Sequence, residues 1–424
     1  MSKFIQGRLK RLKTALKSHR EPSALLLSSA PAATRSLDTH YPYRQDSDFY
    51  YLTGSHAKDL LLLVSPFEPQ PVLFAPRISA QQILWEGRPE GFEALADRLK
   101  ARLVIYRDSL IDIIPALKGV KVLYHKNISG SLSWNVAQHL EKMPAYRRGS
   151  LPMVFAHADN LLIEMRLYKD ESEVEAIKRA VRITAEALQK TAAVIRPSTP
   201  EIEIAATIDY WFRMNGAWPA FNTIIGSGVN GATLHYEALT AKLQEGDLLL
   251  VDCGAEHELY AADVTRVFPV NGMFDERQAA LYETVLAAQK SVISRIKPGV
   301  EVKKLYELAV RKITEGLKDL GILRGKVSNL IDREAYRPYF PHSIGHPLGL
   351  DVHDVWRAGR SDGLVLQPGM VMTIEPGVYL PKRTGKFKPC GIRIEDDVLV
   401  TKRGNQVLTA SIPKDIAEIE SLLR

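Results

Sequence analysis

Apolar residues in the first part of the chain fall into short runs, separated by longer amphipathic segments. The predicted strands are the apolar runs at 24–29, 60–66, 72–76, 102–107 and 121–125. Between them, segments 79–86 and 91–101 have the spacing of helices. This alternation predicts an α/β domain with a mixed sheet.

The N-terminal segment, residues 2–20, is basic, lacks acidic residues and is amphipathic. Its apolar side chains recur at helical spacing, at Ile5, Leu9, Leu12 and Leu16. Such a segment is also typical of a mitochondrial transit peptide. Because the first predicted strand follows within a few residues, we favour a surface helix that belongs to the fold.

Residues 41–54, with the sequence YPYRQDSDFYYLTG, combine aromatic and charged side chains. They contain no set of residues that resembles a nucleophile or a metal site. We therefore interpret this stretch as a packed or interface loop and not as part of a catalytic centre.

Two successive helices are predicted beyond residue 165. Asp170 and Ser172 are candidate N-caps of the first helix. Thr199 is the candidate cap of the second helix, with Pro200 at its first helical position, and this helix ends near Gly216. The helices therefore mark the start of a second domain.

The chain of 424 residues is long enough for two domains. A polar segment at 157–160 precedes the helical pair. We place the boundary there, which gives an N-terminal domain of residues 1–165 and a second domain of residues 166–424.

Residues 246–268 contain two apolar runs around a polar, glycine-containing middle, a pattern that predicts a β-hairpin. One aspartate lies in each run, Asp252 and Asp263, and their midpoint falls between His257 and Glu258. A hairpin symmetric about that point sets the two carboxylates opposite each other on one face. Since bare carboxylates repel each other, this arrangement needs a cation or a shared proton. The alternative is that one aspartate belongs to the turn and the other faces solvent.

The second domain repeats one pattern of two helices, a strand and two acids. In each copy a glycine, five residues, an acid, one residue and a second glycine delimit an apolar strand, at 246–254 and at 369–377. A second acid follows on a later strand of each copy. A duplicated helix–helix–strand unit would bring four acids to one point on its pseudo-twofold axis: Asp252, Asp263, Glu375 and Glu395.

Three of the eleven histidines lie close together, at His342, His346 and His353. Two glycines among them disfavour a regular helix, so residues 341–354 are predicted as a loop or irregular strand. A lone histidine is usually structural, but three near four acids are more typical of a metal ligand with substrate-binding groups.

Composition excludes several function classes. Apolar residues make up 46% and charged residues 25% of the chain, as in globular proteins, and no apolar run is long enough to cross a bilayer. The net charge of +7 is scattered and accompanies no nucleic-acid motif, so we expect neither nucleic-acid nor membrane binding. The two cysteines, Cys253 and Cys390, offer no disulfide framework and indicate a reducing, cytoplasmic location.

Four carboxylates and one imidazole suit a pair of divalent cations such as Mn²⁺, Co²⁺ or Zn²⁺. Two metals that share carboxylates hold a bridging hydroxide at neutral pH, which is a nucleophile for carbonyl carbon. His235 and His353 are candidates to stabilise the oxyanion of the tetrahedral intermediate. The pattern therefore predicts metal-assisted hydrolysis, with an amide as the natural substrate.

The second domain resembles the pita-bread metallopeptidases, the family that includes methionine aminopeptidase, prolidase, aminopeptidase P and creatinase. The residues that match the family's ligands, in the family's order, are Asp252, Asp263, His346, Glu375 and Glu395. Motifs along nearly the whole chain are similar to bacterial aminopeptidase P: YPYRQDSDFYYLTG (41–54), GSGVNGATLHYE (226–237), HSIGHPLGLDVHDV (342–355), TIEPGVYL (373–380) and GIRIEDDVLV (391–400). The resemblance implies an α+β protein in which a pita-bread catalytic domain follows an α/β domain that serves oligomerisation and substrate access.

The resemblance also implies a role for each ligand. Asp263 and Glu395 would bridge two metal ions, most naturally Mn²⁺. Asp252 would chelate one ion, and His346 with Glu375 would complete the other. Glu375 would also accept the proton of the attacking water.

The remaining roles concern the substrate. His235 and His353 would flank the scissile carbonyl, and His342 would line a pocket for proline. Tyr379 and Arg393 would orient Asp252, while Trp85 would either be buried or reach the pocket of a neighbouring subunit.

The implied activity is release of the first residue from peptides that have proline second. The expected partners are such peptides and further copies of the chain, as a dimer or tetramer. Prolidase, which cleaves only Xaa-Pro dipeptides, is the alternative within the family. The remaining alternative is a non-catalytic pita-bread binding module, which the presence of all five ligand residues disfavours.

Overall fold

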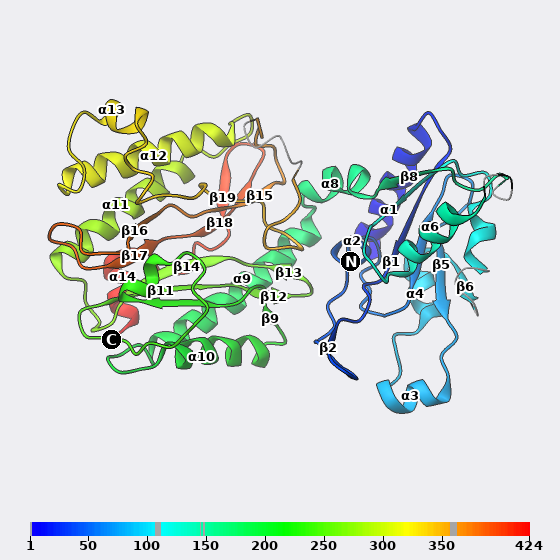
Figure 1. Ribbon diagram of the computed structural model, residues 1–424, viewed down its shortest axis with the longest axis horizontal. Coiled ribbons are helices and arrows are strands. Elements are labelled where there is room, and N and C mark those ends of the chain that lie inside the picture. The colour runs from blue at the N-terminus through cyan, green and yellow to red at the C-terminus, as the bar shows by residue number, and fades with distance from the viewer. Residues whose placement is uncertain (1, 107–111, 145, 147–148, 357–362) are drawn as a thin grey trace. The chain divides into compact units, whose positions relative to one another are not determined.

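The computed structural model describes residues 2–106, 112–144, 146, 149–356 and 363–424. It divides into two compact units, Met1–Arg166 and Leu167–Arg424 (Figure 1). The predicted boundary, between residues 165 and 166, lies one residue from this division.

The N-terminal unit contains a six-stranded sheet in the order β6-β5-β4-β1-β7-β8. Its strands are β1 (Ser23–Ser28), β4 (Leu61–Val64), β5 (Val72–Pro76), β6 (Arg102–Tyr106), β7 (Val122–His125) and β8 (Val154–His157). β1 pairs antiparallel with β4 and parallel with β7, so the sheet is mixed, as predicted. All five predicted strands are present; Arg107, the last predicted residue of β6, lies outside the described residues. Outside this sheet, β2 (Thr34–Ser36) and β3 (Thr39–His40) form a short antiparallel pair.

The described helices of this unit differ in burial. They are α1 (Ser2–Ser18), α2 (Ser47–Thr53), α3 (Ala80–Glu86), α4 (Phe92–Leu99), η1 (Ile114–Leu117), α6 (Leu132–Lys142) and α8 (Asp159–Leu167), which ends at the boundary. α1 buries one face, whereas no residue of α3 is buried. α1 buries Ile5, Leu9, Leu12 and Leu16, so this helix is part of the fold. The polar segment 157–160 joins the end of β8 to the start of α8.

The loop predicted at residues 41–54 is partly wrong, because residues 47–53 form helix α2. Asp46 caps its first turn by accepting the backbone N–H of Phe49, and Gly54 ends it with a φ of 60°. Every residue of α2 is buried. Residues 47–53 are therefore packed, as expected, and Phe49, Tyr50 and Tyr51 belong to a short buried helix. Tyr41 precedes this helix and is 55% exposed.

The C-terminal unit begins with two helices, α9 (Glu171–Ala192) and α10 (Glu201–Met214). Asp170 caps α9 by accepting the backbone N–H groups of Ser172 and Glu173. The predicted cap of α10 is displaced by one residue, since Pro200 stands at the N-cap. The hydroxyl of Thr199 instead donates to the carbonyl oxygen of Val194.

The predicted duplication is present. In the first copy, α9 and α10 precede strands β11 (Leu248–Cys253), β12 (Ala255–His257), β13 (Tyr260–Ala261) and β14 (Val264–Pro269). In the second, α11 (Glu276–Ile293) and α12 (Val302–Asp319) precede β15 (Val371–Ile374), β16 (Gly377–Leu380), β17 (Cys390–Arg393) and β18 (Asp396–Val400). The outer strands of each copy pair with each other, and so do the inner ones. The fold class predicted from the sequence is therefore confirmed.

Shorter elements complete the unit: β9 (Trp218–Pro219), β10 (Ile224–Ser227), η2 (Gly228–Ala232), α13 (Val327–Asp332), β19 (Asn405–Val407) and α14 (Ile416–Leu422). In Figure 1 the strands run between α12 above and α10 below. The core lies where α11 and α12 pack their apolar faces on the strands. Among the described residues, no helix has the length and apolar character needed to cross a membrane.

The first hairpin has a different centre from the one predicted. Its turn is Glu258-Leu259, both with positive φ angles of 50° and 62°, and the ladder sets Asp252 opposite Thr265. Asp263 therefore lies two residues before the position directly across from Asp252. Because side chains alternate with a period of two, this shift keeps both aspartates on one face.

Candidate active site

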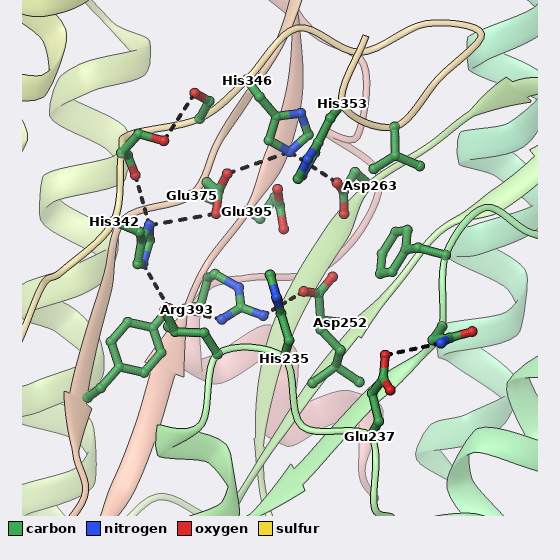
Figure 2. A pocket seen from close by; sticks show the side chains of 18 of the residues that line it. His235, Glu237, Asp252, Asp263, His342, His346, His353, Glu375, Arg393 and Glu395 are labelled. Carbon is green, nitrogen blue, oxygen red and sulfur yellow. Dashed lines mark hydrogen bonds and ion pairs between the residues drawn. The ribbon is translucent and has the colours of Figure 1, made fainter. Parts of the chain in front are cut away.

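A pocket of about 620 Å³ opens in the C-terminal unit at the junction of the two copies. The predicted site residues that line it are His235, Asp252, Asp263, His342, His346, His353, Glu375, Tyr379, Arg393 and Glu395 (Figure 2). Trp85 is not among them: it lies on α3 of the N-terminal unit and is 79% exposed. The interpretation of Trp85 as a buried core residue is therefore wrong.

The four acids lie where strands of the two copies meet. Asp252 lies on β11, Asp263 just before β14, Glu375 just after β15 and Glu395 between β17 and β18. Side chains of Asp252, Asp263 and Glu395 are buried, and that of Glu375 is half-buried. We call these four residues the acid cluster.

Each copy of the duplicated pattern forms a hydrogen bond with an acid of the other copy. Thr265 donates its hydroxyl to Glu395 Oε2 over 2.7 Å. Asp397 Oδ2 accepts the backbone N–H of Asp263 over 3.3 Å. Thr265 and Asp397 stand two residues after Asp263 and Glu395, so each shares the strand face of the preceding acid. That spacing is a signal by which the sequence could have identified both supporting residues, which our prediction missed.

Burial and mutual repulsion make the acid cluster costly to ionise. Burial raises the pKa of Asp263 to about 6 and that of Glu375 to about 7, and nearby carboxylates add to the burial effect. The pKa of Glu395 is raised well above its usual value for the same reasons. Asp252 Oδ1 is buried and has no hydrogen-bond partner among the described residues. Unpaired carboxylate oxygens of this kind are suited to bind cations.

His346 faces the acid cluster through one nitrogen. Its Nε2 lies 3.4 Å from Asp263 Oδ2 and 3.7 Å from Glu375 Oε1. Its Nδ1 is 3.0 Å from the carbonyl oxygen of Pro347, to which an Nδ1–H group donates. A carbonyl acceptor at one ring nitrogen orients the other as a metal ligand. Ligand atoms of Asp263, His346 and Glu395 all lie within 4.8 Å of one another, close enough to share an ion.

Arg393 organises the opposite side of the acid cluster. Its guanidinium donates to Asp252 Oδ2 over 2.5 Å, to the hydroxyl of Tyr379 over 2.9 Å and to Thr265 Oγ1 over 3.0 Å. Tyr379 thus reaches Asp252 only through Arg393. The tyrosine hydroxyl lies 2.9 Å from His342 Nε2, and His342 Nδ1 lies 2.8 Å from the carbonyl oxygen of Ser343.

Three further histidines line the pocket, His342, His353 and His235, and they differ in burial and contacts. Burial and the charge of Arg393 lower the pKa of His342 to about 4, so its imidazole is neutral at pH 7. The ring of His353 stacks edgewise on His346, with 4.2 Å between ring centroids. His235 is exposed on the segment that follows η2. Figure 2 shows all three facing the acid cluster.

Glu237 is a pocket residue that our sequence analysis missed. It lines the pocket two residues after His235 and accepts a hydrogen bond from Asn222. Glu237 ends the motif at 226–237, but local spacing assigned it no role, because its place in the pocket involves a tertiary hydrogen bond from Asn222.

The family model for metallopeptidase family M24 matches residues 175–402, and that for the aminopeptidase P N-terminal domain matches residues 6–124. The chain is 37% identical over 440 residues to the Xaa-Pro aminopeptidase of Escherichia coli (strain K12), covering 100% of this chain and 99% of that protein. The chain belongs to metallopeptidase family M24. Its whole-length match to the Xaa-Pro aminopeptidase places it in the aminopeptidase P group of that family.

Solved M24 structures agree with this assignment. Proline aminopeptidase P II from Yersinia pestis has a TM-score of 0.93 and 38% identity, covering 100% of this chain and 99% of that one. Zinc-substituted E. coli aminopeptidase P in complex with product has a TM-score of 0.91 and 36% identity, covering 99% and 98%. The predicted family, fold and metallo-exopeptidase class are confirmed.

Proposed function

We propose that the pocket binds two divalent metal ions and hydrolyses the bond between the first residue of a peptide and a proline in second position. The observation that carries this proposal is the convergence of four largely buried carboxylates and His346 Nε2 on one point. Membership of the aminopeptidase P group of family M24 supports the choice of bond.

The donor set fits a pair of divalent cations. Asp263 and Glu395 would bridge the ions, Asp252 would chelate one, and His346 with Glu375 would complete the other. The unpartnered Asp252 Oδ1 and the raised pKa values of Asp263 and Glu375 support this assignment, since bound cations would relieve both. Oxygen and imidazole donors suit Mn²⁺, which we expect, with Co²⁺ or Zn²⁺ as alternatives.

Two divalent ions in such a site supply Lewis acidity, which activates water and polarises the scissile carbonyl. Glu375 is the base that would accept the water proton at a carboxylate oxygen. Its Oε1 already accepts a hydrogen bond of 3.3 Å from Thr373, which holds the carboxylate toward the pocket. Arg393 would keep Asp252 in its ligating orientation, with Tyr379 fixing the guanidinium.

The histidines would handle the substrate. His235 and His353 would flank the scissile carbonyl and donate hydrogen bonds to its oxygen as negative charge develops there. His342, neutral and anchored by Tyr379, would line the space for the proline ring. An Xaa-Pro bond has a tertiary amide nitrogen without N–H, so a pocket shaped for the ring favours this bond.

We also propose that the chain forms a dimer or tetramer in the cytoplasm. Leu84 and Trp85 of α3 are 83% and 79% exposed, and no residue of this helix is buried. Exposed apolar side chains on a short helix are suited to contact another copy, where Trp85 would contribute to the pocket. Two reduced, buried cysteines support the cytoplasmic location.

The test is a paired assay on metal-free protein reconstituted with Mn²⁺. Release of the first residue from Arg-Pro-Pro, abolished in Asp263→Asn, is the expected result. Cleavage of an Xaa-Pro dipeptide alone would make the protein a prolidase. Bound metal without cleavage of either peptide would contradict the proposal and favour a non-catalytic binding module.

A further inference from the structure

Glu237 is an acid of the pocket wall that does not belong to the acid cluster. Among the described residues that line the pocket, the other carboxylates are the four of the cluster. The four cluster acids would face two divalent cations, and Asp252 also pairs with Arg393, whereas the hydrogen-bond donor at Glu237 is the uncharged amide of Asn222. Figure 2 shows Glu237 and His342 on opposite sides of the acid cluster, with Glu237 on the side of Asp252.

The wall around Glu237 is built from segments beside Asp252. Ile224 is the ladder partner of Asp252, and Asn222 precedes it by two residues. Asn222 Nδ2 donates to Glu237 Oε1 over 3.1 Å. An amide donor carries no net charge, so this bond holds the carboxylate in place and leaves it able to attract a cation. Phe221 lies beside Gly254, 3.2 Å from where a Cβ would stand, and gives the same wall an apolar surface.

The direction of the substrate follows from the proposed function, on which this inference rests. With proline on the His342 side and the scissile carbonyl between His235 and His353, the first residue extends toward Asp252 and Glu237. An aliphatic chain with a terminal cation suits a wall of this kind, because Phe221 contacts the stem and Glu237 attracts the charge. We propose that Glu237 forms a subsite for a basic first residue and gives the protein a preference for arginine or lysine before proline.

The test compares three tripeptides that differ in the charge of the first side chain: Arg-Pro-Pro, citrulline-Pro-Pro and Glu-Pro-Pro. Citrulline has nearly the shape of arginine without the charge, so it isolates the ion pair. With full-length protein loaded with Mn²⁺, we expect kcat/KM for the arginine peptide to exceed that for the citrulline peptide by about two- to fivefold, the range of an exposed ion pair. The glutamate peptide is expected to be the poorest, and the preference to shrink at high salt.

The decisive variant is Glu237→Gln, which removes the charge and keeps the size. It should bring the arginine-to-citrulline ratio close to one, because kcat/KM falls further for the arginine peptide than for the citrulline peptide. The matched control is Glu245→Gln, an equal charge change at an exposed residue outside the pocket lining, which should keep the wild-type ratio.

Three outcomes would overturn the subsite. Equal rates for the arginine and citrulline peptides in the wild type exclude an ion pair. An unchanged ratio in Glu237→Gln, with no loss for any of the three peptides, assigns the ion pair elsewhere. An equal loss for all three peptides in Glu237→Gln would mean that Glu237 binds the α-amino group. In each case cleavage of the citrulline peptide would still support the proposed function, whereas no cleavage of any tripeptide by metal-loaded protein would refute both.

Discussion

At the scale of single residues, the acid cluster stores unfavourable electrostatic energy in the metal-free protein. Asp263 illustrates this, because its carboxylate is buried beside other acids and its pKa is raised to about 6. Its interactions with His346 and Arg393 only partly offset the cost. Such a site lowers the free energy of unfolding of the metal-free protein, and metal binding raises it again.

Asp263→Asn is therefore expected to stabilise the metal-free protein and to inactivate the enzyme. A folded pKa above the ordinary value of 3.8 means that ionised Asp263 destabilises the fold as pH rises through about 6. At pH 8 the variant should be more stable than metal-free wild type by about 1–3 kcal/mol, and the difference should vanish below about pH 4. Thermal unfolding of both proteins at several pH values measures this.

The control for that prediction is thermal unfolding of both proteins with added Mn²⁺. Mn²⁺ should raise the melting temperature of the wild type and leave that of Asp263→Asn nearly unchanged. A metal-free variant less stable than wild type at pH 8 would contradict the prediction, because it would mean that contact with His346 outweighs burial and repulsion.

At the scale of elements, the segment that carries His235 is fixed to the start of α10 by Glu201. The Glu201 carboxylate is fully buried and accepts hydrogen bonds from Ser227, Asn230, Tyr236 and the backbone of Ala241. Tyr236 points into this contact, while its neighbour His235 faces the pocket. One buried carboxylate therefore sets the position of a proposed substrate-binding residue.

Glu201→Gln should lower kcat/KM by about tenfold without loss of metal. The amide places N–H groups where the carboxylate accepted hydrogen bonds, which costs about 1–3 kcal/mol in the segment. Metal content and melting temperature with and without Mn²⁺ are measured alongside activity. Glu203→Gln, on an exposed position of the same helix, is the control.

The double variant with His235→Ala decides how Glu201 acts. If Glu201 works by positioning His235, its substitution should cost little more activity once His235 is absent. Additive losses would contradict positioning and assign Glu201 a separate role.

The elements also show what sequence patterns can predict. Apolar periodicity located the strands and the helical pairs, and the repeated pattern of glycines and acids located the four acids, because both depend on local spacing. The register of β11 and β14 could not be predicted, since the turn uses Glu258 and Leu259 at positive φ where glycine or asparagine is usual. Glu237 could not be predicted either, because a tertiary hydrogen bond from Asn222 brings it to the pocket.

At the scale of the whole molecule, Asp396 joins the catalytic strands to the C-terminal segment. It is fully buried, and it binds Arg266, Lys414, Gln289 and Thr409. Burial raises the pKa of Asp396, but the two cations outweigh it and hold the pKa below its usual value. Arg266 in turn donates to the carbonyl oxygen of Glu395, so this network lies directly behind the acid cluster.

Asp396→Asn should lower the free energy of unfolding by about 3–5 kcal/mol, because it leaves Arg266 buried without a counter-charge. A depressed pKa stabilises the fold at neutral pH, and this contribution is lost as pH falls through the folded value below 3.8. The variant should therefore lose less stability than wild type on acidification. Urea unfolding at pH 7 and pH 3 measures this, and Asp319→Asn on an exposed position of α12 should match wild type at both pH values.

The exposed side chains of α3 give a prediction about assembly. Light scattering at micromolar concentration should give the mass of a dimer or tetramer, and Leu84→Ser with Trp85→Ser should reduce it. A wild-type mass of 47.4 kDa, that of one chain, would contradict the proposed oligomer.

The crossed support of the acid cluster has a consequence for how such a protein can arise. Thr265 of the first copy holds Glu395 of the second, and Asp397 of the second holds Asp263 of the first. A single ancestral copy could have completed the site only by pairing with another of its kind. After gene duplication, each copy could then diverge in sequence only while its contacts to the other survived, which ties the evolution of the two halves together.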